Sequence, residues 1–365
     1  MSLQIGIVGL PNAGKSTLFN ALTQAGAATA PYPFTTIDPN VGVTAVPDPR
    51  LDQLAALIRP EKVVPAAVEF VDIAGLVQGA SQGAGLGNQF LGHIRNVDAV
   101  VLVLRGFADP DVPTQGEAVD PLADLETLET ELILADVGTM DRRIEKVLGQ
   151  AKSRPRDFAE QLAWLGRLRD HLNNGQAAVL FDEPAHHSDW TADLNLLSGK
   201  PRLYVVNVSE DALPDGSQAA AALRARAAQE GIPCLTLCAL CESELVTWDA
   251  EEAAAYRTDL GLPEPGLNQL IHASYRLLGL ITFFTITGGK ETRAWTLRRG
   301  QTAFEAAGLI HTDIQRGFIR AEVAPQAALV AAGGLAGARS QGQVRLEGKE
   351  YLVQDGDVIH FRFNV

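Results

Sequence analysis

One short stretch near the start of the chain constrains the fold more than any other feature. Residues 9–17 read GLPNAGKST, and they follow the apolar run LQIGIVG at residues 3–9. The spacing G-x-x-x-x-G-K-S/T between a strand and a helix is typical of a loop whose backbone N–H groups surround phosphate oxygens. The start of the following helix adds partial positive charge at the same place. The stretch therefore predicts a phosphate-binding loop in an α/β domain.

The rest of the first 240 or so residues alternates between apolar runs and segments of helical character. Further strands are predicted at residues 66–72, 98–105 and 202–208, with another near 233–238. Alternation of this kind is typical of a doubly wound, mostly parallel sheet. We therefore predict the α/β class for the main body of the chain.

Two segments depart from this alternation. Between residues 122 and 174 the sequence has no strand signals, and its leucines recur at helical spacing, first at Leu125, Leu128 and Leu132. We interpret this as a helical hairpin inserted at about residues 122–198; the alternative is a pair of ordinary packing helices. From residue 279 short β-like runs separated by glycines predict a small α+β domain at 279–363, after a main domain at 1–278.

The phosphate-binding loop implies a bound metal ion and a set of ligands. In loops of this kind the lysine reaches the β- and γ-phosphates and the next hydroxyl binds Mg²⁺, which makes Lys15 a catalytic candidate and Ser16 a metal ligand. Asp72, at the end of a predicted strand, is expected to hold Mg²⁺ as well. The predicted nucleotide contacts in the loop are Asn12, Ala13, Gly14, Lys15, Ser16 and Thr17.

Two segments that could close over the phosphates complete the predicted site. Thr36, in Pro-Phe-Thr-Thr at residues 33–36, is expected to be the second hydroxyl ligand of Mg²⁺ and a catalytic residue, with Thr35 as the competitor. Gly75, in Asp-Ile-Ala-Gly at 72–75, is expected to meet the γ-phosphate through its N–H. Leu76 follows where related switch proteins place a water-orienting glutamine, so slow intrinsic turnover is expected.

Composition excludes several classes of function. The net charge is −14, with residues 280–365 carrying 10 Lys and Arg against 8 Asp and Glu, so nonspecific wrapping of nucleic acid, DNA included, is not expected. No apolar run is long enough for a membrane helix. The three cysteines, Cys234, Cys238 and Cys241, have no nearby histidine, and buried reduced thiols are favoured over a zinc site. A cytoplasmic protein is expected.

These motifs together resemble the Obg-like ATPase (YchF) family, which is related to the translation-factor class of P-loop GTPases. The resemblance spans nearly the whole chain and includes EFVDIAGLVQGASQGAGLGNQFL at 69–91, AAGLIHTDIQRGFIRAEV at 306–323 and DGDVIHFRFNV at 355–365. It implies an OBG-type G-domain with an inserted helical hairpin, followed by a ubiquitin-like (TGS, β-grasp) domain.

The residues after the strand at 202–208 bear on which base is bound. GTPases carry Asn-Lys-x-Asp there, and the aspartate accepts two hydrogen bonds from guanine; here the corresponding residues are Asn207, Val208 and Glu210. Because adenine lacks those two donors, the altered motif favours adenine, and the resemblance favours it further. We expect Asn207 to supply an amide contact to the base and Val208 an apolar or backbone contact.

The resemblance implies a ribosome-associated ATPase that converts ATP to ADP and phosphate and acts as a switch linked to translation or stress. The expected partner is the ribosome, through its large subunit and RNA, and a monomer is the default. The alternatives are a GTP-hydrolysing translation factor and a non-hydrolytic, nucleotide-gated binding module. A competition between ATP and GTP would separate the first alternative, and single turnover with ribosomes the second.

Two details remain open at the level of sequence. Family members often have a histidine where alignment places Thr114, so what positions the attacking water is not evident. Asn12 suggests the hypothesis that K⁺ binds near the phosphates. Two basic groups could face RNA or simply be solvated, one in the C-terminal domain and one at the hairpin tip: His311, Arg316, Arg320 and Lys349, and Lys146, Lys152, Arg154 and Arg156.

Overall fold

The computed structural model describes residues 3–29, 40–73, 86–108, 119–182, 190–191 and 193–364. By its internal contacts the chain divides into two compact units. Unit 1 comprises residues 1–24, 36–42 and 69–270, and unit 2 comprises residues 25–35, 43–68 and 271–365. The sequence predicted a boundary after residue 278, and that boundary stays a prediction.

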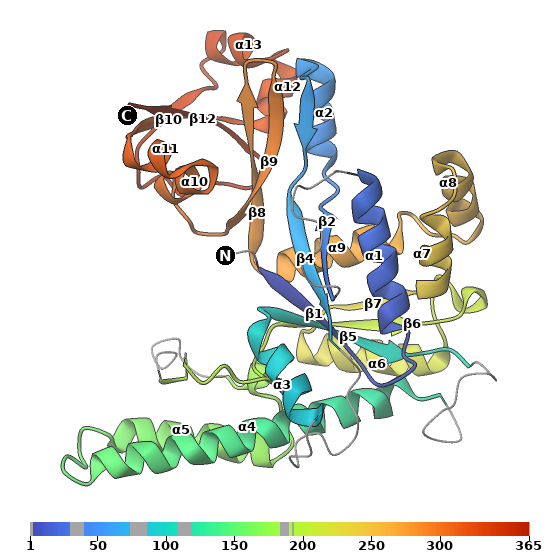
Figure 1. Ribbon diagram of the computed structural model, residues 1–365, viewed down its shortest axis with the longest axis vertical. Coiled ribbons are helices and arrows are strands. Elements are labelled where there is room, and N and C mark those ends of the chain that lie inside the picture. The colour runs from blue at the N-terminus through green and yellow to red at the C-terminus, as the bar shows by residue number, and fades with distance from the viewer. Residues whose placement is uncertain are drawn as a thin grey trace. The chain divides into compact units, whose positions relative to one another are not determined.

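The main sheet has six strands in the order β2-β4-β1-β5-β6-β7 (Figure 1). The strands β1 (Gln4–Val8), β4 (Ala67–Asp72), β5 (Ala99–Arg105), β6 (Arg202–Asn207) and β7 (Cys234–Leu237) pair in parallel. All five correspond to predicted strands, so the doubly wound parallel sheet is confirmed. The edge strand β2 (Val41–Ala45) was not predicted, because VGVTA is short and contains a glycine.

Buried aliphatic side chains explain why these segments form central strands. In β5 all seven residues are buried, and in β6 all six are, which is the pattern of strands covered on both faces. Unit 1 contains the helices α3 (Leu86–Asn96), α6 (Gln218–Glu230), α7 (Ala239–Leu245) and α8 (Ala250–Asp259), while α1 (Lys15–Thr29) and α9 (Gly266–Leu277) begin in unit 1 and end in unit 2. Short 3₁₀ turns lie at η2 (Ala178–Leu180) and η4 (Glu210–Ala212).

The inserted hairpin is present as two long antiparallel helices, α4 (Pro121–Ala151) and α5 (Ala159–Asn173), seen extending as a pair in Figure 1. Asp120 caps α4, since its carboxylate accepts hydrogen bonds from Leu122 N at 2.9 Å and Ala123 N at 3.2 Å. Leu125, Leu128 and Leu132 belong to the core of the main sheet. Farther along, Met140 and Val147 instead pack against α5 residues, including Trp164 and Leu168.

A buried polar network fixes the hairpin's first helix to the main sheet. Glu129 of α4 accepts hydrogen bonds from Arg202 of β6 at 3.1 Å and from Arg226 of α6 at 2.7 Å. Asp136, fully buried in α4, accepts from Leu197 N, Ser198 N and Ser198 Oγ at 2.8, 2.7 and 2.6 Å. Both carboxylates are thereby paired or hydrogen-bonded, as burial requires.

Unit 2 contains a second six-stranded sheet, in the order β11-β10-β12-β8-β9-β3. Its strands are β3 (Lys62–Val64), β8 (Leu280–Thr287), β9 (Glu291–Arg298), β10 (Phe318–Pro325), β11 (Arg345–Glu347) and β12 (Asp357–Phe363). Its helices are α2 (Pro49–Ile58), α10 (Ala303–Ile310), α11 (Thr312–Arg316), α12 (Gln326–Ala331) and α13 (Leu335–Ser340). The strands β8 and β12 are parallel neighbours, as expected for a ubiquitin-like β-grasp.

The N-terminal part of the chain contributes to this second sheet, which the sequence did not predict. Strand β3 pairs in parallel with β9, and Arg50 of α2 forms an ion pair with Asp355 at 2.9 Å. The hydrogen bonds that Arg50 donates to Asp48 and Asp355 raise the pKa of Arg50, and burial opposes that shift. A segment far from the C-terminal residues in sequence is therefore built into their fold.

Candidate functional site

The loop between β1 and α1 has the backbone that the glycine pattern predicts. Asn12 and Gly14 both have positive φ, +64° and +89°. A Cβ on Gly14 would lie 2.2 Å from Asn207 Nδ2, and one on Gly9 would lie 2.4 Å from Val103 O. Only glycine fits at residues 9 and 14, because a Cβ there would overlap the Val103 carbonyl oxygen or the Asn207 amide.

The loop leads into the first turn of α1. The N–H groups of that turn come before the first backbone hydrogen bond of the helix. That bond runs from Leu18 N to Gly14 O at 3.0 Å. The N–H groups of Lys15, Ser16 and Thr17 therefore lie at the open start of the helix, where a helix can receive an anion. Ala13 is buried, Ser16 is exposed and Thr17 is partly exposed, so the predicted contacts of this loop differ in accessibility.

Lys15 lies beneath the loop rather than in solvent. Its side chain is largely buried, and Nζ donates a hydrogen bond to Leu10 O at 2.8 Å. Burial lowers the pKa of Lys15, and the charge of Asp72 opposes that shift. A phosphate beside Nζ would favour the charged ammonium further, because an opposite charge stabilises it.

Ser16 and Asp72 meet where β4 ends. Ser16 Oγ donates to Asp72 Oδ2 at 3.0 Å. The other carboxylate oxygen, Asp72 Oδ1, is buried and has no hydrogen-bond partner among the described residues. A buried carboxylate oxygen without a donor is costly, and a hydroxyl beside a carboxylate is a donor set that suits Mg²⁺. These two predicted ligands therefore fit the ion.

The remaining predicted residues of the phosphate site cannot be placed. Thr36 and its competitor Thr35, Gly75 and Leu76, and Thr114 all lie outside the described residues. Their roles stay predictions.

Asn207 stands at the end of β6 and connects two loops. Its Nδ2 donates to Ala13 O at 3.0 Å, and its Oδ1 accepts from Ala239 N at 2.9 Å. The side chain is buried, so the amide braces the phosphate-binding loop against the start of α7. The contact of Asn207 with the base stays a prediction.

The two residues after Asn207 that bear on the base are placed differently. Val208 is buried in the main core, and its N–H donates to Leu237 O at 2.9 Å. Glu210 is exposed, and its Oε1 accepts from Tyr256 Oη at 2.5 Å. This bond raises the pKa of Tyr256 to about 12. The carboxylate at the guanine-reading position is therefore held toward α8, where Trp248 packs 5.2 Å from the Tyr256 ring.

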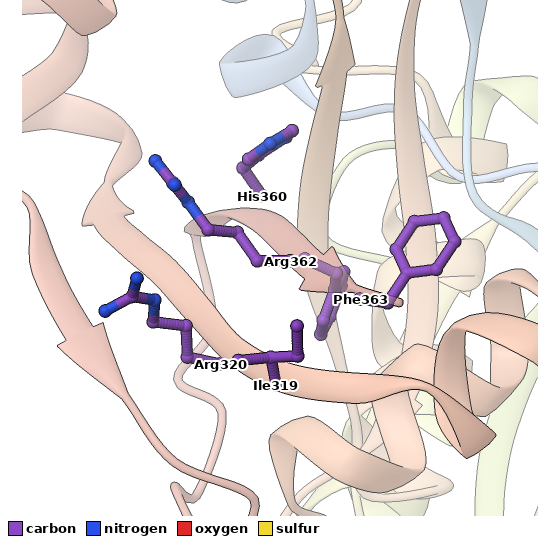
Figure 2. A pocket seen from close by; sticks show the side chains of 6 residues that line it. Ile319, Arg320, His360, Arg362 and Phe363 are labelled. Carbon is purple, nitrogen blue, oxygen red and sulfur yellow. The ribbon is translucent and has the colours of Figure 1, made fainter. Parts of the chain in front are cut away.

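A second surface lies on the C-terminal sheet, where the sequence predicted a basic face. An open hollow of about 640 Å³ is lined by Ile319, Arg320, His360, Phe361, Arg362 and Phe363. Figure 2 shows the side chains of Arg320 and Arg362 extending in the same direction from β10 and β12. Arg362 and Arg339 both pair with Glu322, while Arg320 has no ion pair within the described chain.

The other residues of the predicted basic face are already engaged. Arg316 pairs with Asp313 at 2.5 Å, His311 caps α11 through Nδ1, and Lys349 lies over the Phe304 ring. His360 and Arg362 were missed by the sequence reasoning. Their alternation with buried Ile359 and Phe361 in VIHFRF was the signal that could have found them.

The hairpin tip carries the second predicted basic group. Lys146, Lys152, Arg154 and Arg156 are all exposed, and none has an ion pair in the part of the chain that the structure describes. Leu148 beside them is 51 % exposed. Unpaired cations around an exposed leucine are more typical of a contact surface than of a paired, solvated face.

Two other features are not found among the described residues. No described helix has the length and apolar character needed to cross a bilayer. No group of three or more His, Cys, Asp and Glu side chains is placed to hold a metal within the same residues.

Known proteins and family models that are similar to this chain support the parallel sheet and the phosphate-binding loop. The model described as "50S ribosome-binding GTPase" matches residues 4–148, and the model YchF-GTPase_C, described as "Protein of unknown function (DUF933)", matches residues 280–364. The chain is 52% identical to "Ribosome-binding ATPase YchF" of Bacillus subtilis and 46% identical to the protein of that name in Escherichia coli O157:H7, with 100% of each chain covered.

A solved structure is similar over the same length. The YchF GTPase of Schizosaccharomyces pombe superposes with a TM-score of 0.89 at 33% identity, covering 99% of this chain and 98% of that one. Full-length identity at this level, together with a P-loop G-domain and a C-terminal domain, means that the chain belongs to the YchF family.

Proposed function

We propose that this chain is a ribosome-associated ATPase that hydrolyses ATP to ADP and phosphate as a nucleotide-dependent switch. The observation that carries the ATPase part is the arrangement of Lys15, Ser16 and Asp72 around one loop, with Asp72 Oδ1 left unpaired among the described residues. The ribosome enters from the relatives, which bear the name Ribosome-binding ATPase. A cytoplasmic location follows from that partner.

Different groups of this chain bind the phosphates, offset their charge and hold the metal ion. The N–H groups at the start of α1 hold the phosphate oxygens, and Lys15 offsets charge that develops on the β- and γ-phosphates. Ser16 and Asp72 would hold Mg²⁺, with Thr36 as the proposed third ligand. When bound, Mg²⁺ supplies charge neutralisation between the β- and γ-phosphates.

Adenine preference is supported by the position of Glu210. Guanine recognition in the usual way needs a carboxylate aimed at its N1–H and 2-amino groups. Here the hydrogen bond from Tyr256 holds Glu210 away from that task, and Val208 replaces the lysine whose stem covers the base. A site without the acceptor gains nothing from guanine's two donors, which favours ATP over GTP.

The ribosome contact is proposed to lie at the hairpin tip, through RNA of the large subunit. Charge reversal at Lys152, Arg154 and Arg156 should abolish cosedimentation with ribosomes and leave ATP turnover without ribosomes unchanged. Reversal at Lys62, which is exposed on β3, serves as the matched control. Loss of binding on Arg320→Glu alone would move the contact to the C-terminal sheet.

The proposed activity is tested by titrating the full chain with ATP, GTP and their diphosphates in the presence of Mg²⁺. Tighter binding of ATP supports the proposal, whereas a strong preference for GTP supports a translation GTPase. Single-turnover hydrolysis with and without ribosomes separates a slow ATPase from a non-hydrolytic module. Equal turnover in KCl and NaCl would exclude the hypothesis that Asn12 helps bind K⁺.

A further inference from the structure

Two of the three cysteines stand together at the junction of β7 and α7. Cys238 and Cys241 are separated by Ala239 and Leu240, which gives the spacing Cys-x-x-Cys. Cys238 Sγ accepts a hydrogen bond from Cys241 N at 3.3 Å, and the two thiols are also hydrogen-bonded to each other. Both are reduced in the structure. The geometry therefore brings two thiols into direct contact at one turn.

The three thiols differ in acidity in a way that suits disulfide chemistry. Hydrogen bonds from the Cys241 thiol and from the N–H groups of Cys241 and Leu240 lower the pKa of Cys238 to about 7. The same contact with Cys238 raises the pKa of Cys241. Burial raises the pKa of Cys234 to about 11. Cys238 is therefore the thiol of the three that ionises most readily, and the raised pKa values of Cys241 and Cys234 favour their protonated forms.

A small cavity gives the pair a place to meet an oxidant. It has a volume of about 10 Å³ and is lined by Cys238 and Cys241 together with Glu242 and several leucines. A cavity of this size holds roughly one water molecule. Hydrogen peroxide is only slightly larger than water, whereas glutathione and other peptide thiols are far larger. The site therefore suits a small peroxide.

The turn that carries the two cysteines is connected to the phosphate-binding loop. Ala239, which lies between them, donates its N–H to Asn207 Oδ1 at 2.9 Å, and Asn207 Nδ2 donates to Ala13 O at 3.0 Å. A disulfide requires its two Cβ atoms to lie about 3.8 Å apart with a fixed torsion. Ala239 lies on the short segment that such a bond would constrain, so the disulfide would act on the residue that holds the brace on the loop.

We propose that Cys238 and Cys241 form a redox-active dithiol, oxidised by hydrogen peroxide to a disulfide that weakens nucleotide binding. The second half of this proposal rests on the proposed nucleotide site. The Cys238 thiolate attacks one peroxide oxygen, the O–O bond breaks, and the hydroxide that leaves takes a proton and becomes water. The Cys241 sulfur then displaces the hydroxyl of the resulting sulfenic acid, its proton leaves with that hydroxyl as a second water, and the S–S bond forms.

Mass spectrometry of the full chain tests the dithiol without reference to nucleotide. Peroxide treatment should make the chain about 2 Da lighter, with a 238–241 linkage in the digest, and dithiothreitol should reverse the change. Cys238→Ser and Cys241→Ser should each abolish it, and Cys234→Ser, the matched control, should not. The rate should rise from about pH 6 to about pH 8 as Cys238 ionises. No disulfide, or one that includes Cys234, would overturn the proposal.

The affinity for ATP tests the regulatory half. Oxidised chain should bind ATP roughly three- to tenfold more weakly than reduced chain, the size of one lost buried hydrogen bond, and reduction should restore it. Peroxide should leave the affinity of Cys241→Ser unchanged. Equal affinity of the two wild-type forms would overturn the regulation. If neither form bound ATP, the proposed function would fail while the mass result would still decide the dithiol.

Discussion

The phosphate-binding loop and the base-side loop lie at the carboxyl ends of strands in one sheet, yet they are built on different principles. At residues 9–17 the geometry is set by the backbone, with positive φ at Asn12 and Gly14 and no room for a Cβ at Gly9. At residues 207–210 it is set by side-chain partners, since Asn207 braces the loop and Tyr256 holds Glu210.

This difference indicates how phosphate binding and base preference should each respond to substitutions. The phosphate-binding loop, which is shaped by its backbone, tolerates few substitutions because every N–H must point toward the phosphates. Single substitutions there should therefore abolish phosphate binding. A loop held by side chains can be retuned one hydrogen bond at a time, so base preference should shift gradually. The predictions below test that contrast, from the largest expected effect to the smallest.

The largest effect, on ATP hydrolysis, is expected at the buried lysine of the phosphate-binding loop. Lys15→Ala should lower single-turnover ATP hydrolysis by roughly 100-fold or more, because the charge beside the β- and γ-phosphates is lost. Quench-flow measurement of phosphate release checks this, with thermal unfolding to show that the variant is folded. Lys62→Ala, at an exposed lysine, should hydrolyse ATP as the wild type does. A Lys15→Ala variant with near-normal turnover would contradict the assignment.

A smaller effect, on the free energy of unfolding, is expected from adding one methyl group to the phosphate-binding loop. Gly9→Ala should reduce the free energy of unfolding by about 1–3 kcal/mol, because its Cβ would meet Val103 O at 2.4 Å. Urea unfolding measures this. Gly166→Ala on α5, where nothing lies within 4 Å, should instead stabilise the chain by about 0.5–1 kcal/mol. If both variants shift in the same direction, the close approach at Gly9 is not what requires glycine.

Removing the brace between the two loops should weaken binding without changing base preference. Asn207→Ala breaks the bonds to Ala13 and Ala239, and the affinities for ATP and GTP should fall together by roughly tenfold. Calorimetric titration with each nucleotide checks this, with Asn20→Ala on the exposed side of α1 as the control. A loss confined to ATP would mean that Asn207 acts mainly by reading the base.

The smallest effect is expected at the residue that holds Glu210. Tyr256→Phe releases the carboxylate, so the affinity for GTP should rise roughly two- to threefold while the affinity for ATP stays constant. Competition of the two nucleotides for one fluorescent analogue gives the ratio. Tyr351→Phe, at a tyrosine between β11 and β12 that also donates to a carboxylate, should leave that ratio unchanged. An unchanged ratio in Tyr256→Phe would show that Glu210 is kept from the base by something else.

The sequence was sufficient where a pattern reflects the backbone. The glycine spacing at 9–17 and the apolar runs of β1, β4, β5, β6 and β7 follow directly from local geometry and burial. The same holds for the hairpin, whose leucines at helical spacing are buried as predicted.

The sequence was insufficient where distant segments determine the structure. Strand β3 has only three residues and forms because β9 offers it a partner. The bond between Glu210 and Tyr256 joins residues 46 positions apart, and no periodic pattern marks either one. Asn207 was expected to meet the base, and its two contacts with Ala13 and Ala239 depend on loops that no local rule places together.

The most direct test of the account is the affinity of the full chain for ATP and GTP, each titrated with Mg²⁺ into wild type and into Asp72→Ala. The account predicts tighter binding of ATP by the wild type, and a marked loss of Mg²⁺-dependent affinity for both nucleotides in Asp72→Ala. Preference for GTP, or Mg²⁺-dependent binding that survives the loss of Asp72, would contradict it.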